Sequence, residues 1–115
     1  MSERKTIVHV EDNQQTRKLV QRILSEDYEL VQVERAEDAL QYLAKAHLVY
    51  SDIEQPNSKG GMWLLGYILQ NHPDLPVVLT SGANFTLEDF PGAKEFLQKP
   101  VNVSAIEKTI RKYSK

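Results

Sequence analysis

The stretch LVYSDIEQPNSKGG, residues 48–61, decides how the chain folds. It begins with a short, mostly apolar run, LVYSD (48–52), that is typical of a buried strand. The polar loop QPNSKGG follows directly, and its Pro, Asn and Gly residues are turn formers. A helix is then expected from near Met62 until HPDLP ends it. A buried strand that leads through a loop into a helix indicates an α/β protein.

The rest of the chain repeats this alternation of apolar runs and amphipathic segments. Further strands are expected at 6–10, 28–34, 76–80 and 95–98, and further helices at 13–26, 36–47 and 103–113. This order predicts a doubly wound, five-stranded parallel sheet with helices on both faces. In the segment ANFTLEDFPGAKEF (83–96), Thr86 can cap a turn through Asp89, but Pro91 and Gly92 interrupt it. The fourth helix is therefore expected to be short or irregular.

Composition narrows the class of protein. A length of 115 residues with 41% hydrophobic content fits one domain, expected over 1–115. The net charge of -2 and the scattered Lys and Arg residues argue against direct nucleic-acid binding. The chain has no cysteine, which excludes disulfides and thiolate metal sites. No signal peptide or membrane-spanning apolar stretch is present in the sequence, so a cytoplasmic protein is expected.

Polar side chains follow four of the five predicted strands. They are Glu11 and Asp12 after the first strand, Asp52 at the end of the third, Thr80 and Ser81 at the fourth, and Lys99 after the fifth. Because the carboxyl ends of parallel strands meet at one edge of a sheet, these groups are expected to converge. Crowded carboxylates repel each other unless a cation neutralises them. The sequence therefore predicts a Mg²⁺ site of the kind used in phosphoryl transfer.

Each of these residues also has an ordinary structural interpretation. Glu11, Asp12 and Asn13 can simply cap the first helix, and a lone Lys99 is usually a solvated surface charge. His9, His47 and His72 show no metal-ligand spacing and are given no functional role. Agreement among several strand ends favours a site over separate structural roles.

Four motifs together resemble the receiver domains of response regulators: HVEDN (9–13), SDIEQP (51–56), LTSG (79–82) and FLQKP (96–100). The resemblance covers nearly the whole chain, as expected for a single-domain response regulator, and implies the flavodoxin-like strand order 2-1-3-4-5. It implies the following roles: Asp52 as phosphoacceptor; Glu11, Asp12, Asp52 and the backbone carbonyl of Glu54 as Mg²⁺ ligands; Thr80 as the hydroxyl that meets the phosphoryl group; Lys99 as its ammonium partner; and Phe96 as an aromatic switch. It further implies a histidine kinase or histidine phosphotransfer protein as phosphoryl donor, a downstream protein as output partner, and a signalling module rather than an enzyme.

The motifs depart from the family pattern in three places. The loop from Pro56 to Gly61 is one residue longer than the commonest form, Gln55 replaces a usual Met with little effect expected on the chemistry, and the segment from Thr80 to Lys99 is shorter.

Other functions fit the sequence less well. Phosphatases of the haloacid-dehalogenase type have the motif DxDx[TV] on the first strand, where this chain has HVEDN. A flavodoxin-like cofactor binder needs a Gly-rich or hydroxyl-rich loop there instead of an acidic one. A non-phosphorylated pseudo-receiver that serves as an interaction module remains the alternative function.

Overall fold

The computed structural model describes residues 4–115, so residues 1–3 of the predicted domain lie outside the described residues. Its strands are β1 (Thr6–Val10), β2 (Glu29–Val33), β3 (Leu48–Asp52), β4 (Val77–Ser81) and β5 (Glu95–Gln98). Its α-helices are α1 (Gln14–Leu24), α2 (Ala36–Ala39), α3 (Gly60–Asn71) and α4 (Val103–Tyr113), and its 3-10 helices are η1 (Leu40–Lys45) and η2 (Leu87–Asp89). No helix within 4–115 has the length and apolar character that crossing a membrane requires.

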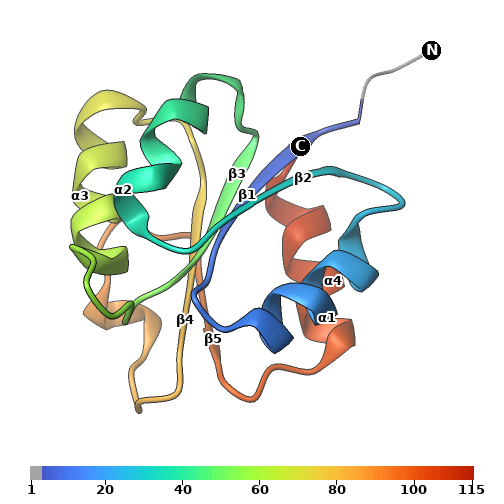
Figure 1. The fold of residues 1–115 in the computed structure, drawn as a ribbon. Helices are drawn as coiled ribbons and strands as arrows, with labels where there is room; N and C mark the ends of the chain where they lie inside the picture. The colour runs from blue at the N-terminus through green and yellow to red at the C-terminus, as the bar shows by residue number, and fades with distance from the viewer. Residues whose placement is uncertain (1–3) are drawn as a thin grey trace.

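The five strands form one parallel sheet in the order β2-β1-β3-β4-β5. Helices α2 and α3 cover one face, and α1 and α4 cover the other (Figure 1). Both the doubly wound α/β class and the strand order predicted from the sequence are confirmed. All parallel strands point the same way, so the segments that follow β1, β3, β4 and β5 leave the sheet at the same edge.

Successive side chains on a strand point to opposite faces of the sheet, so the core is divided into two halves. Val8, Val49 and Leu79 pack with α2 and α3, whereas their neighbours Ile7, Leu48 and Val78 pack with α1 and α4. β1, β3 and β4 are buried along their whole length because helices cover both of their faces. This explains why they read as nearly continuous apolar runs.

The second predicted helix, expected as one segment over 36–47, differs in the structure. It starts as an α-helix of four residues, α2, and continues as the 3-10 helix η1. In the 3-10 segment Leu43 is the buried residue, and the Ala46 amide donates to the Leu43 carbonyl as the helix ends. The buried residues Ala36, Ala39 and Leu43 lie within the predicted range, but the second half of the segment has the tighter turn of a 3-10 helix.

The loop between β3 and α3 contains a non-glycine residue with positive φ. Asn57 has φ of 58°, a left-handed conformation that Asn tolerates better than most residues. Helix α3 starts at Gly60, earlier than predicted, with Gly61 packed against the backbone of β3. A Cβ on Gly61 would lie 2.6 Å from the Asp52 carbonyl oxygen, so only glycine allows this close approach.

The helix between β4 and β5, predicted to be the short fourth helix of the chain, is the 3-10 helix η2 and contains three residues. Thr86 is its N-cap residue, as predicted, and the Thr86 amide donates to the Asp89 carboxylate at 2.8 Å. Phe90 then ends the turn with its ring buried in the core. The connection between β4 and β5 is therefore anchored by one aromatic side chain rather than by a helix.

Candidate functional site

Three carboxylates meet at the carboxyl edge of the sheet. Glu11 and Asp12 follow β1 and Asp52 ends β3, and one carboxylate oxygen from each residue lies within 4.8 Å of the others. Glu11 and Asp52 are buried and Asp12 is half-buried. The convergence predicted from the strand ends is present. An all-oxygen, partly solvent-open set of this kind suits a hard divalent cation.

Lys99, just beyond β5, supplies the positive charge of the site. Its ammonium donates to Glu11 Oε1 at 2.9 Å and to Asp52 Oδ2 at 3.0 Å. Burial lowers the pKa of Lys99, but the hydrogen bonds to the two carboxylates outweigh it and the pKa is raised overall. The ammonium contacts two of the three carboxylates and carries one positive charge against their three negative charges, so the site retains negative charge that a divalent cation would neutralise.

Glu11 faces the site and does not cap α1. The N-cap is Asn13, whose side chain accepts from the Thr16 amide at 2.9 Å. Burial raises the pKa of the Glu11 carboxyl and the nearby charge of Asp52 adds to this, although Lys99 opposes the shift. A costly buried carboxylate that is not needed as a cap indicates a role in the site.

Glu54 lies beside Asp52, the predicted acceptor. Its amide donates to Asp52 Oδ1 at 3.3 Å, which links the start of the loop to the last residue of β3. Its carboxylate accepts a hydrogen bond from the Ser81 hydroxyl at 2.7 Å. The side chain of Glu54 therefore connects the ends of β3 and β4.

The two hydroxyls at the end of β4 have different surroundings. Thr80 is buried, and its hydroxyl donates to the Leu97 carbonyl of β5 at 2.6 Å. Ser81, also buried, donates to Glu54 and accepts from the Ala83 amide at 3.0 Å. The sequence-based assignment gave the functional hydroxyl to Thr80. Because neighbouring side chains on a strand point to opposite faces, Ser81 is a separate candidate with a direct contact to the loop after Asp52.

Gln55, expected to matter little for the chemistry, holds this loop in place. Its side-chain oxygen accepts from the Ala36 amide at 3.0 Å, and its side-chain nitrogen donates to the Ser51 hydroxyl at 3.2 Å and to the Asp52 carbonyl. The buried amide thus connects the start of α2 to the end of β3. Composition alone could not show this bridge, because a Gln in a polar loop is usually exposed.

Phe96 is half-buried within a cluster of three aromatic rings. Its ring centroid lies 5.5 Å from Phe90 and 6.2 Å from Phe85, and those two rings are 5.1 Å apart. Phe85 and Phe90 belong to the connection after β4. The predicted switch aromatic therefore contacts the segment that follows the two candidate hydroxyls.

Sequence reasoning gave His9 no role, and the structure shows it buried on β1. The ring stacks on Tyr50 at 5.1 Å, and Nδ1 lies 3.1 Å from the side-chain nitrogen of Gln32. Burial, with smaller effects from Lys99 and Arg17, lowers the pKa of His9 to about 3. His9 is therefore a neutral core residue of β1, two positions before Glu11 in the chain.

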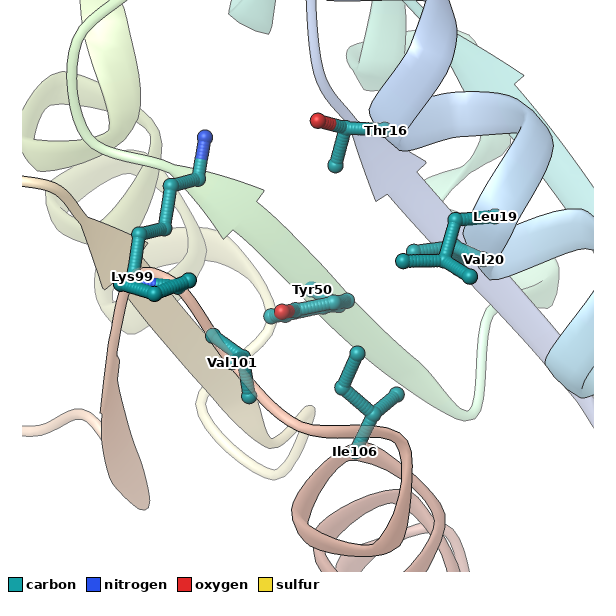
Figure 2. A pocket seen from close by; sticks show the side chains of 8 residues that line it. Thr16, Leu19, Val20, Tyr50, Lys99, Val101 and Ile106 are labelled. Carbon is teal, nitrogen blue, oxygen red and sulfur yellow. The ribbon is translucent and has the colours of Figure 1, made fainter.

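A largely apolar cavity of about 370 Å³ adjoins the site on the side of α1 and α4. Figure 2 shows Tyr50 between the side chains of α1 and those of the segment after β5. The cavity is lined by Thr16, Leu19, Val20, Tyr50, Lys99, Pro100, Val101 and Ile106. Lys99 lines the cavity and also donates hydrogen bonds to two residues of the acidic cluster.

Comparison with known proteins identifies the family. The profile of the response regulator receiver domain matches residues 7–111, and the chain belongs to this family. No curated protein sequence matches the chain significantly. Among solved structures, the signal receiver domain of an HD domain-containing protein from Pseudomonas fluorescens Pf-5 is 25% identical, with a TM-score of 0.86 over 96% of this chain and 94% of that one.

Two further structures have the same fold. The CheY-like response regulator receiver domain protein from Methanospirillum hungatei JF-1 is 24% identical, with a TM-score of 0.86 over 97% of this chain and 94% of that one. NtrX from Brucella abortus is 30% identical with a TM-score of 0.84, and the match covers 97% of this chain but 27% of the longer NtrX chain. Receiver domains act in two-component signalling and are generally signalling modules rather than enzymes.

Proposed function

We propose that this receiver domain accepts a phosphoryl group on Asp52 in a Mg²⁺-dependent reaction. The observation that carries the proposal is the joint position of the Asp52 carboxylate, two further carboxylates and the Lys99 ammonium at one edge of the sheet. In phosphoryl transfer, positioning and charge stabilisation supply most of the catalysis. This set of groups provides both.

The residues divide into those for the metal and those for the phosphoryl group. Glu11, Asp12, Asp52 and the backbone carbonyl of Glu54 would hold Mg²⁺, which when bound would neutralise charge on the phosphoryl oxygens. An oxygen of Asp52 attacks the phosphorus of a phosphohistidine. The new P–O bond forms as the P–N bond breaks, and the histidine nitrogen keeps the electron pair. Lys99 would then turn from the carboxylates toward a phosphoryl oxygen as a point charge.

A hydroxyl of β4 would complete the phosphorylated state. Thr80 has this role by sequence resemblance, but its hydroxyl is committed to a β5 carbonyl, whereas Ser81 already contacts the residue two positions after Asp52. We therefore favour Ser81. The matched variants Ser81→Ala and Thr80→Val separate the two: loss of the phosphorylation-induced shift of Phe96 resonances in Thr80→Val alone would return the role to Thr80.

Residues 1–115 would act as one receiver domain between two kinds of protein. A histidine kinase or a histidine phosphotransfer protein would donate the phosphoryl group. A downstream protein would bind according to the phosphorylation state, through the face that includes Phe96 and α4. The aromatic cluster supports this output, because it joins the connection after β4 to β5.

The test is incubation with acetyl phosphate and Mg²⁺, read by intact mass. The expected result is one added phosphoryl group on the parent protein and none on Asp52→Ala or in the presence of a chelator. Equal labelling of Asp52→Ala would contradict the proposed acceptor. No labelling of the folded parent protein would instead favour the pseudo-receiver alternative.

A further inference from the structure

The hydrogen bond between Ser81 and Glu54 has a consequence for how the domain switches. The Ser81 hydroxyl donates to Glu54 Oε1 at 2.7 Å, a short distance typical of a charge-assisted hydrogen bond. Ser81 is fully buried, whereas Glu54 lies at the exposed rim of the site. A buried hydroxyl is thus directed toward a carboxylate near the acceptor Asp52.

A serine hydroxyl has only one hydrogen to donate. The hydroxyl can bond to the Glu54 carboxylate or to an oxygen of a group on Asp52, but it cannot donate fully to both. The unphosphorylated structure contains the first arrangement. The Glu54 side chain therefore occupies the donor that the phosphorylated state would use.

The oxygen of the same hydroxyl supports the chain that follows β4. It accepts from the Ala83 amide at 3.0 Å, at the start of the connection that carries Phe85. The Phe85 ring in turn lies 6.2 Å from Phe96. A rotation of the Ser81 side chain away from Glu54 would weaken the contact with Ala83 and so change the support of the aromatic cluster.

We propose that Glu54 is an internal competitor for the Ser81 hydroxyl, so that a phosphoryl group on Asp52 must displace the Glu54 carboxylate before the domain switches. The inference rests on the proposed phosphorylation of Asp52. It assigns to Glu54 a regulatory role through its side chain, distinct from the backbone carbonyl that would face the metal. Glu54 acts through Ser81 and is a positioning residue.

The experiment measures the affinity of the protein for beryllofluoride with Mg²⁺, since this anion bonds to a carboxylate oxygen and has the tetrahedral shape of a phosphoryl group. Calorimetric titration compares the parent, Glu54→Ala, Ser81→Ala and the double variant. Glu54→Ala removes both a repelling charge and the competing acceptor. In the Ser81→Ala background it removes the charge alone.

Competition predicts that Glu54→Ala strengthens binding roughly fivefold more in the parent than in the Ser81→Ala background. This factor is smaller than a fully buried charge-assisted hydrogen bond would give, because solvent at the exposed rim weakens the contact with Glu54. An equal gain in both backgrounds would overturn the proposal, because the effect would then be electrostatic only. Failure of the parent to bind beryllofluoride would instead overturn the proposed function on which the inference rests.

Glu54→Gln provides a second test that leaves Ser81 intact. Its amide oxygen can still accept the hydroxyl, but its charge is gone. Competition predicts a smaller gain in affinity for Glu54→Gln than for Glu54→Ala, together with a shift of the Ala83 amide resonance in unliganded Glu54→Ala but not in Glu54→Gln. Identical affinities and identical Ala83 shifts in the two variants would contradict it.

Discussion

Replacing Lys99 with Met tests how much the site depends on its ammonium. The side chain is 28% exposed, and it donates to Glu11, which is 1% exposed, and to Asp52, which is 9% exposed. Breaking a buried ion pair by removing one partner typically costs about 3–5 kcal/mol, because the other charge stays buried without compensation. Since Lys99 itself is partly solvated, we expect the lower end, a loss of about 3 kcal/mol at pH 7.

The assay is urea unfolding without divalent ions, with the exposed Lys94→Met as matched control. A surface substitution of this kind should change stability by no more than about 0.5 kcal/mol. The same Lys99→Met change is then made in a Glu11→Gln background, where one buried carboxylate is already neutral. The cost should fall by at least about 1 kcal/mol there, because less charge is left unpaired. An equal cost in both backgrounds, or no difference between Lys99→Met and Lys94→Met, would refute this reasoning.

Three further predictions concern buried side chains and a close backbone contact. Folding lowers the pKa of His9 from 6.5 to about 3. Between these two values the imidazole is protonated in the unfolded chain but not in the folded chain, so the folded state loses stability as the pH falls below 6.5. Acidification from pH 7 to pH 5 should therefore cost the parent about 2 kcal/mol more than His9→Phe, and equal urea midpoint shifts would contradict this. In urea unfolding, Phe90→Ala should lower the free energy of unfolding by about 3–4 kcal/mol. Phe85→Ala should lower it clearly less, because Phe85 is 37% exposed, and the reverse order would show that the connection is anchored elsewhere. Gly61→Ala should weaken Mg²⁺ binding in calorimetry, because its Cβ would displace the Asp52 backbone, and unchanged affinity would count against this close approach.

The sequence predicted the sheet well because its central strands are buried on both faces. The bounds of β1 and β3 agree with the predicted segments, since buried side chains must occupy every position there. The bounds of the edge strand β5 also agree, although two of its four residues are polar. The convergence of Asp52 and Lys99 was also predictable, because parallel strands bring their carboxyl ends to one edge. In these parts, local pattern and global fold impose the same constraint.

Other structural features depend on contacts that the spacing of apolar residues along the sequence does not reveal. The change from α2 to η1 is not visible in the spacing of the apolar residues, and the orientation of Ser81 depends on its hydrogen bond to Glu54. The bridge made by Gln55 needs the start of α2 beside the end of β3, residues far apart in the chain. The burial of Phe90, which anchors one end of the connection from 83 to 92, likewise depends on packing that the sequence pattern does not reveal.

The phosphoacceptor assignment can be tested most directly by locating the modified residue chemically. After treatment with acetyl phosphate and Mg²⁺, borohydride reduction converts a phosphorylated aspartate to homoserine, and peptide mass spectrometry identifies its position. Asp52 should be the residue converted, and omitting Mg²⁺ should abolish the conversion. Homoserine at Asp12 or at another carboxylate, or conversion that is independent of the metal, would contradict the assignment of Asp52 as the acceptor in a magnesium site.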